Sequence, residues 1–233
     1  MIRRQLLQAL FRAAEWASAI SSTNRPPESR EILILSAHTP DIAGYAEIAA
    51  ENKRRYAQRH GYAFRSITTG FDPTRPPAWS KIRFIQRALH EYRWVFWSDA
   101  DALIMNDAVP LQRFIVPDAD VHLTRALSPF PHINTGHMFF RRCPFSRVFL
   151  NAVWKLSVFT HDSTWEQRAV NHLVDNYSFA RLRISPNREF NAYGEVQGDP
   201  SPYRLGDFIV HFPGKPDKLE LMQRYAALGA KSL

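Results

Sequence analysis

The sequence predicts an α/β domain built on a largely parallel sheet, and two observations carry this prediction. Near-continuous apolar runs of strand length, such as 31–37 (EILILSA) and 94–98 (WVFWS), are typical of strands buried on both faces. Between such runs lie longer segments in which apolar residues recur at helical spacing. Since 45% of the 233 residues are apolar, the chain can bury a sizeable core, which excludes disorder for most of its length.

Residues 1–30 are expected to form a helix and a linker ahead of the domain proper, which spans 31–233. The helix carries apolar residues on one face with arginines beside them: Leu6, Leu7, Leu10, Phe11 and Ala14, with Arg3, Arg4 and Arg12. We favour a helix that packs on the domain; the alternative is a helix lying in the plane of an anionic membrane. The polar, proline-bearing stretch 21–30 is typical of a linker.

Residues 31–67 predict the first strand–helix–strand unit. After the first strand, Thr39 and Pro40 can open a helix, and Gly61 is suited to end it. Residues 62–67 have the composition of the next strand. This order predicts a parallel pair with a right-handed crossover.

The remaining elements follow at regular intervals. Ser80 can cap a second helix, and the strand 94–98 ends directly at Asp99. Later elements are expected at strands 121–124, 136–140 and 208–212 and at helices 145–156, 164–175 and 218–228. The stretch 185–206 is long and irregular, and such segments in compact domains are often functional.

The charge and cysteine content limit the classes of function. The chain has 24 Arg and 6 Lys, 30 basic residues against 22 acidic ones, so its formal charge is +8. This charge favours an anionic partner: nucleic acid, a membrane face or a phosphorylated substrate. Cys143 is the single cysteine, so no internal disulfide can form.

The sequence also bears on location. A membrane-spanning helix needs about 20 consecutive apolar residues, and the apolar runs here are far shorter. The N-terminus lacks the clean apolar stretch of a secretory signal. We therefore expect a cytoplasmic protein, with peripheral contact at the inner membrane face as the extension of that expectation.

A pair of aspartates marks the end of one buried strand. Asp99-Ala100-Asp101 follows the run WVFWS directly, and ligands of open α/β sheets bind at the carboxyl ends of strands. Aspartates at i and i+2 of an extended chain project to the same side and can share one divalent cation. Hard oxygen ligands suit magnesium or manganese. A helix cap or a surface turn is the other common use of such aspartates.

A second strand end adds an imidazole and positive charge. The run FIVH ends at His211, and Gly214, Lys215 and Lys218 follow closely. Glycine allows backbone N–H groups to approach a phosphate, and lysine supplies a point charge. An imidazole beside two carboxylates favours manganese over magnesium.

Five motifs in this order resemble glycosyltransferase family 34, the retaining α-galactosyl-, α-mannosyl- and α-xylosyltransferases. They are Lys81-Ile82 before a helix, WVFWSDADALIMN, NTGHMFFRRC, WEQ and HFPGK, and the segment NKRRYAQRHGYAF is also similar to that family. The resemblance covers roughly residues 31–225. It implies the GT-A nucleotide-diphospho-sugar transferase fold, a single Rossmann-like domain with a mostly parallel mixed sheet flanked by helices.

The resemblance also implies roles for individual residues. Asp99 and Asp101 match the family's DxD metal ligands, and His211 matches its C-terminal metal-binding histidine. The implied donor contacts are Lys81, Asp99, Ala100, Asn134, Gly136, Gly214 and Lys215, with Lys218 as an alternative to Lys215 because the spacing after Gly214 departs from the family. Glu166 and Gln167 match an acidic–Gln pair beside the reacting carbon, although the family usually has Asp at the first position.

Some of these residues have simpler interpretations. Ser163-Thr164-Trp165-Glu166 fits a capping box, in which Glu166 holds a helix N-terminus. The segment from Asn134 to Gly136 fits a turn before a strand. Lys81 fits a solvated first-turn residue. Trp165, like Trp79 and Tyr193, is suited either to stacking on an acceptor sugar or to the core.

The resemblance implies a metal-dependent retaining transferase that moves a hexose or pentose from a nucleotide-diphosphate sugar to a hydroxyl of a glycan or glycolipid. The favoured donor is a UDP-sugar, and the expected cofactor is Mn²⁺, with Mg²⁺ as the alternative. A phosphohydrolase that uses a DxD after a strand is a second hypothesis. A basic nucleic-acid binder is a third, but the arginines are scattered, so no nucleic-acid partner is expected.

Overall fold

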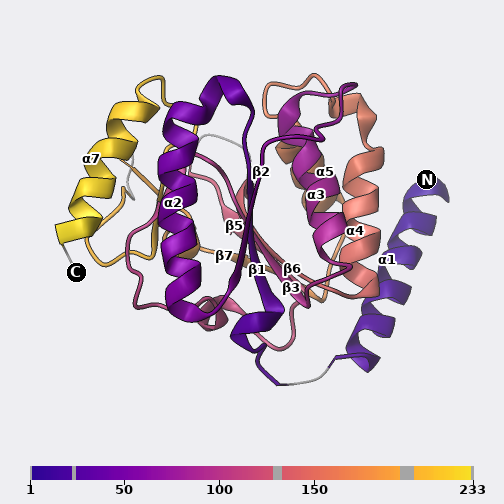
Figure 1. The fold of residues 1–233 in the computed structure, drawn as a ribbon. Coiled ribbons are helices and arrows are strands. Elements are labelled where there is room, and N and C mark those ends of the chain that lie inside the picture. Colours follow the sequence, from indigo (N-terminus) through magenta and orange to yellow (C-terminus); the bar gives the residue numbers. More distant parts are fainter. Residues whose placement is uncertain (1, 23–24, 128–132, 195–201, 232–233) are drawn as a thin grey trace.

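A six-stranded sheet forms the centre of the protein, with helices on both of its faces (Figure 1). The structure is a computed structural model that describes residues 2–22, 25–127, 133–194 and 202–231. Along the sheet the strands are β2 (Ala63–Ile67), β1 (Ile32–Ala37), β3 (Trp94–Ser98), β6 (Ile133–Arg141), β5 (Val121–Arg125) and β7 (Leu182–Ser185). Only β6 runs antiparallel to its neighbours, β3 and β5, so the predicted mostly parallel α/β architecture is confirmed.

The helices form a layer on each face of the sheet. Helices α2 (Ala43–His60) and α7 (Lys218–Lys231) lie side by side on one face (Figure 1). The other face carries α3 (Ser80–Ala88), α4 (Pro144–Lys155) and α5 (Glu166–Asn176). Besides the N-terminal helix described below, the described residues form one short helix, α6 (Asn187–Phe190), and several 3₁₀ turns: 29–31, 40–42, 77–79, 111–114 and 157–159.

A small second sheet brings two distant parts of the chain together. It consists of β4 (Ala102–Ile104), β9 (Ile209–His211) and β8 (Ala192–Tyr193), with β9 in the middle. Ala102 pairs with His211 in the antiparallel register of β4 and β9, and Phe212 donates its backbone N–H to the carbonyl of Asp101 at 3.0 Å. This register places the aspartates after β3 beside the histidine that ends β9.

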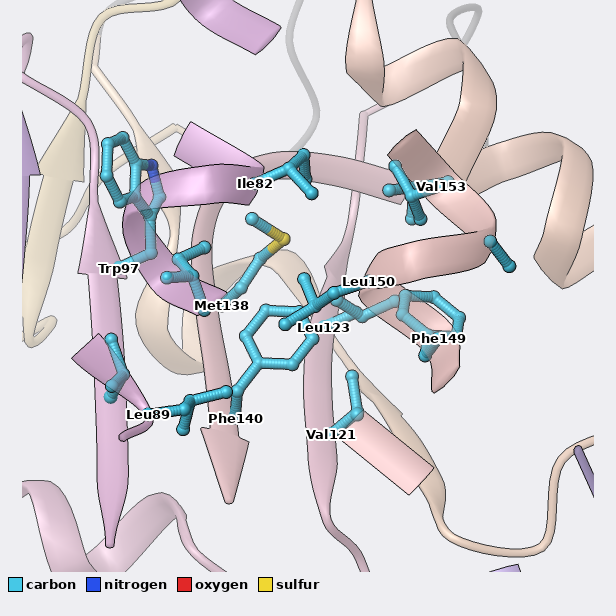
Figure 2. Packing of buried hydrophobic residues seen from close by; sticks show 14 of the residues in the cluster. Ile82, Leu89, Trp97, Val121, Leu123, Met138, Phe140, Phe149, Leu150 and Val153 are labelled. Atoms are coloured by element: carbon cyan, nitrogen blue, oxygen red, sulfur yellow. The ribbon is translucent and has the colours of Figure 1, made fainter. Parts of the chain in front are cut away.

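The larger core fills the space between the central sheet and α3, α4 and α5. Figure 2 shows Trp97, Met138 and Phe140 of the sheet packed against Ile82 of α3 and Leu150 of α4. Strands β1 and β3 are buried along almost their whole length because both faces of the sheet are covered there, which is why they appear in the sequence as unbroken apolar runs.

The N-terminal helix α1 (Ile2–Ile20) packs on α4 at the flank of the molecule (Figure 1). Phe11 and Ala14 are buried, and the Phe11 ring meets the rings of Tyr177 and Phe179 edge-on. The opposite side of the helix is also apolar: Leu6, Leu10, Trp16 and Ile20 each expose about half or more of their surface. The single apolar face expected from the sequence is therefore divided between the core and the outside.

Most predicted elements occur where the sequence placed them, with local differences. Gly61 ends α2 in the left-handed conformation at φ 70°, as expected. Ser80 does not cap α3; its Oγ accepts a hydrogen bond from the Asp72 N–H instead. Within 185–206 the described residues include α6 and β8, and residues 195–201 lie outside the described part. Across the described ranges, no helix combines the length and apolarity needed to cross a bilayer.

Candidate active site

The two aspartates lie in a turn between β3 and β4, not in extended chain as the sequence argument assumed. The turn nevertheless directs both carboxylates to the same place, because β4 leaves β3 to join the second sheet. Asp99 Oδ1 accepts hydrogen bonds from Trp97 Nε1 at 2.7 Å and from Lys81 Nζ at 3.0 Å. Below the turn, the fully buried Lys53 of α2 donates to the backbone carbonyl of Asp99 at 2.6 Å.

Asp101 lies between a histidine and a lysine from the C-terminal part of the chain. Its Oδ1 is 3.1 Å from His211 Nε2, and its Oδ2 is 2.6 Å from Lys218 Nζ. Burial alone would raise the pKa of the Asp101 carboxyl, but His211 and Lys218 outweigh burial and hold that pKa well below its usual range. Asp101 is therefore an anionic group under all ordinary conditions.

A buried ion pair links the aspartate turn to the start of α5. Lys81 Nζ lies 2.9 Å from Glu166 Oε1, and that same oxygen accepts a hydrogen bond from Thr135 Oγ1 at 2.9 Å. Burial opposes charge on Lys81, yet Asp99 and Glu166 raise its pKa above the ordinary value. The alternative interpretation of Glu166 as part of a capping box is therefore wrong: Glu166 is the first residue of α5 and is buried, and the residue before the helix makes no side-chain cap.

A chain of amide hydrogen bonds connects His211 with Gln167. Asn191 Oδ1 lies 2.8 Å from His211 Nδ1 and 2.7 Å from His137 Nδ1, and Asn191 Nδ2 donates to Asn134 Oδ1 at 3.0 Å. Asn134 Nδ2 then donates to Gln167 Oε1 at 3.2 Å. Asn134 and Gly136 lie within β6, so the alternative interpretation as a turn before the strand is wrong.

These residues fit a divalent cation. One ligand atom each from Asp99, Asp101 and His211 lies within 4.8 Å of the others. Asn191 Oδ1 accepts a hydrogen bond from His211 Nδ1, so Nε2, which lies 3.1 Å from Asp101 Oδ1, is the ring nitrogen that would bind the ion. Two carboxylates and an imidazole suit manganese and, less closely, magnesium.

Gly136 allows His211 to occupy this position because glycine has no side chain. A Cβ built on Gly136 would lie 2.3 Å from Cε1 of His211, so only glycine allows the imidazole to rest against β6. Gly136 does not line the cavity described below; its place in the structure is beneath the histidine.

All the other predicted site residues open onto one cavity of about 1060 Å³. Its lining includes the following predicted residues: Asp99, Ala100, Asp101, Lys81, Asn134, Glu166, Gln167, His211, Gly214, Lys215 and Lys218. Trp165 and Tyr193 also line the cavity, whereas Trp79 is fully buried and donates its Nε1–H to Thr160, so Trp79 belongs to the core.

Two residues that the sequence analysis missed hold this site together. Lys53 lies in the segment NKRRYAQRHGYAF and Asn191 in the irregular stretch 185–206, but the sequence analysis assigned neither residue a role. Burial lowers the pKa of Lys53 to about 8, which shows how strongly the interior opposes its charge. A further sequence signal for Lys53 is its position on the apolar face of a predicted helix, four residues before the buried Ala57.

Comparison with solved structures defines the class of fold. The chain superposes with a TM-score of 0.69 on a glycosyltransferase involved in glycosylation of the major capsid of PBCV-1, at 24% identity over 83% of this chain and 98% of that one. It superposes with a TM-score of 0.59 on the galactosyltransferase LgtC, at 12% identity over 84% of this chain and 95% of that one. The fold is the GT-A fold of glycosyltransferases.

The sequence identifies the family. The galactosyl transferase GMA12/MNN10 family matches residues 28–131 and 120–216, and the chain belongs to this family. An alpha-1,2-galactosyltransferase of Schizosaccharomyces pombe is 25% identical over 84% of this chain, and the chain spans 64% of that relative's length. A probable alpha-1,6-mannosyltransferase, MNN10 of Saccharomyces cerevisiae, is 25% identical over 72% of this chain and 54% of its own length.

Proposed function

We propose that the protein is a metal-dependent retaining glycosyltransferase that moves a hexose or pentose from a nucleotide-diphosphate sugar, with UDP favoured, to a hydroxyl of a glycan or glycolipid. The observation that carries the proposal is the convergence of Asp99, Asp101 and His211 with three lysines in one cavity. Manganese, with magnesium as the alternative, would neutralise the donor diphosphate and stabilise it as a leaving group. Family membership supports this choice of reaction.

Lys215 and Lys218 are placed to stabilise the negative charge that develops on the leaving diphosphate. Lys218 Nζ lies 2.6 Å from Asp101 Oδ2, and Lys215 lies on the loop that follows β9. A diphosphate entering between them gives Lys218 a second anionic partner, so either lysine can stabilise charge where it builds up on the leaving group. Gly214, at φ 68°, lets this loop turn tightly toward the cavity.

In this proposal the residues at the start of α5 act on the donor sugar. Gln167 Oε1 is held in place by the N–H groups of Asn134 Nδ2 and Thr135 N, both at 3.2 Å, and presents a partial negative charge toward a positive anomeric carbon. Glu166 is paired with Lys81, which weakens it as a nucleophile, and its Oε2 has no partner among the described residues. We therefore favour same-face attack by the acceptor, with Glu166 Oε2 accepting a donor-sugar hydroxyl.

The test is transfer and metal binding by Asp101→Ala. We expect loss of metal-dependent transfer from a nucleotide sugar, while Asp118→Ala, which removes an exposed carboxylate elsewhere, retains it. Near wild-type transfer by Asp101→Ala would refute the assignment. Release of inorganic phosphate from simple phosphomonoesters, without binding of any sugar nucleotide, would favour the phosphohydrolase alternative.

We also propose that the outer face of α1 contacts the surface of a membrane that contains anionic lipid. Leu6, Leu10, Trp16 and Ile20 form an exposed apolar stripe, and the exposed Arg12 stands beside it. An apolar stripe with adjacent positive charge is the pattern of helices that lie in an anionic bilayer surface.

Vesicle binding tests this contact. Leu10→Gln with Trp16→Gln should weaken binding to phosphatidylglycerol-containing vesicles by about tenfold, because both side chains lose their apolar contact with the lipid. Val158→Gln, an exposed valine away from α1, is the matched control. Equal binding by the two variants would contradict the proposal.

A further inference from the structure

A second cavity, unrelated to the active site, lies between helices α3 and α4. This α3–α4 groove has a volume of about 880 Å³ and shares no lining residue with the active-site cavity. Its lining also includes Gly70 and Asp72, from the loop before α3, and Cys143, directly before α4. Leu89 and Leu150, both labelled in Figure 2, form part of its apolar floor.

The rim of the groove carries an excess of positive charge. Arg83 and Arg87 come from α3, Arg142 and Arg147 flank the start of α4, and Asp72 is the one acidic residue that lines the groove. Across the described ranges none of the four arginines forms an ion pair. Arg83 and Arg87 are spaced i, i+4 on a helix without an acidic residue, an arrangement in which like charges repel each other.

Most N–H donors of the four arginines have no hydrogen-bond partner among the described residues. The guanidinium of Arg83 lies 4.3 Å from the centre of the Trp154 ring, and that of Arg87 lies 5.0 Å from the Phe84 ring. Stacking uses the flat face of a guanidinium and leaves the N–H groups at its edge available. Arg83 donates one hydrogen bond to Gln86 Oε1 at 3.0 Å, and Arg142 donates one to the His90 carbonyl at 3.3 Å. Arg147 makes no side-chain hydrogen bond among the described residues.

We propose that the α3–α4 groove is a binding site for a phosphate ester, separate from the donor site and independent of the proposed function. The guanidinium fork matches phosphate oxygens bidentately, and a set of four arginines suits a dianion. The volume exceeds that of phosphate alone, and the apolar floor fits the carbon skeleton to which the phosphate is attached. A lipid headgroup and a free phosphorylated small molecule share this chemistry.

Calorimetric titration of the full chain with glycerol 3-phosphate tests the site. We expect binding that weakens by about tenfold or more in Arg87→Gln/Arg147→Gln, since each lost bidentate contact removes a charge-assisted pair. Arg55→Gln/Arg113→Gln removes the same charge from exposed positions outside the groove and should bind like the wild type. Lys215→Gln/Lys218→Gln separates the groove from the diphosphate site and should also leave this binding unchanged.

Vesicles and a nucleic acid complete the test. Binding to phosphatidic acid vesicles that depends on Arg87 and Arg147, in place of or in addition to glycerol 3-phosphate, supports the site and identifies a headgroup as its source. Equal binding by the groove variant and its control, or binding of neither phosphate ester, overturns the proposal. Arginine-dependent binding of a DNA oligonucleotide alone also overturns it. Unchanged melting temperatures confirm that the variants are folded.

Discussion

Two glycines of this chain differ sharply in what a single methyl group would meet. At Gly136 a Cβ would collide with the His211 ring, whereas at Gly44, in α2, it would meet nothing within 4 Å. Gly136→Ala should therefore push the imidazole away and weaken Mn²⁺ binding by about tenfold or more, the usual cost of disturbing what orients a ligand. Manganese titration followed by electron paramagnetic resonance measures this.

Gly44→Ala is the matched control for that variant. It should bind manganese normally and stabilise the protein by about 0.5–1 kcal/mol, because alanine loses less conformational freedom than glycine in a helix. Equal manganese affinities for the two alanine variants would show that His211 does not need its present position.

Trp165 is the one non-glycine residue with positive φ among the described residues, at φ 49° and ψ −127°. It directly precedes Glu166 and Gln167, 45% of its surface is exposed, and it lines the cavity. Such a backbone costs about 1–3 kcal/mol when a Cβ is present. Strain at this position fits a side chain held for an acceptor sugar.

Replacing Trp165 by glycine and by alanine separates strain from contact. Trp165→Gly should be more stable than Trp165→Ala by about 1 kcal/mol, the reverse of the usual order, because only glycine tolerates this backbone without strain. Both variants should raise the KM for the acceptor more than they lower kcat. Denaturant unfolding and acceptor kinetics measure the two effects, and an alanine variant as stable as the glycine variant would remove the case for strain.

At the scale of elements, a buried ion cluster fastens α1 to the sheet. Asp120, fully buried before β5, forms ion pairs with Arg141 and Arg181, and Arg141 also donates to the Ser18 carbonyl of α1 at 2.9 Å. Burial would raise the pKa of Asp120, but Arg181 and Arg141 lower it, so the carboxylate stays charged. The N-terminal helix thus depends on a charge outside itself.

Asp120→Asn should destabilise the protein by about 3–5 kcal/mol, because it leaves two arginine charges poorly compensated. The amides of α1 should lose hydrogen-exchange protection first. Asp107→Asn, which breaks the exposed pair with Arg59, should cost at most about 1 kcal/mol. Unaltered exchange in α1 of the Asp120 variant would mean that the cluster does not hold the helix.

The sequence predicted elements well where one physical pattern dominates. The unbroken apolar runs located β1 and β3, and the rule that ligands bind at strand ends brought Asp99 and His211 into one hypothesis. Short strands such as β8, with two residues, carry too little pattern to be recognised. The packing of α1 was ambiguous because apolar residues lie on both of its sides, and a sequence does not show which side meets the core.

The supporting residues of the site were beyond sequence reasoning for a different reason. Lys53 and Asn191 act through partners 46 and 20 residues away, a relation created only by the fold. A lysine inside a helix and an asparagine in an irregular stretch have ordinary surface roles by default. Only the structure shows that both side chains are buried and that each has a specific hydrogen-bond partner.

At the scale of the whole molecule, buried histidines make folding sensitive to acid. Burial lowers the pKa of His122 to about 3, from 6.5, with Arg183 adding to the effect and Asp120 opposing it. Burial likewise lowers the pKa of His137 well below its ordinary value. Between about pH 3 and pH 6.5 the unfolded chain binds a proton at His122 and the folded chain does not. The free energy of unfolding therefore has its full value above about pH 6.5 and falls as the pH drops toward 3.

Each such histidine contributes a slope of about 1.4 kcal/mol per pH unit in the free energy of unfolding. His122→Gln keeps an acceptor for the Val116 N–H but cannot be protonated. It should therefore remove the contribution of one histidine to this slope. His161→Gln, at an exposed position, should leave the slope unchanged. Urea unfolding at a series of pH values between about 7 and 5, above the range where most carboxylates titrate, measures the slope. Equal slopes for wild type and His122→Gln would show either that His122 is protonated in the folded protein or that its pKa is already lowered in the unfolded chain.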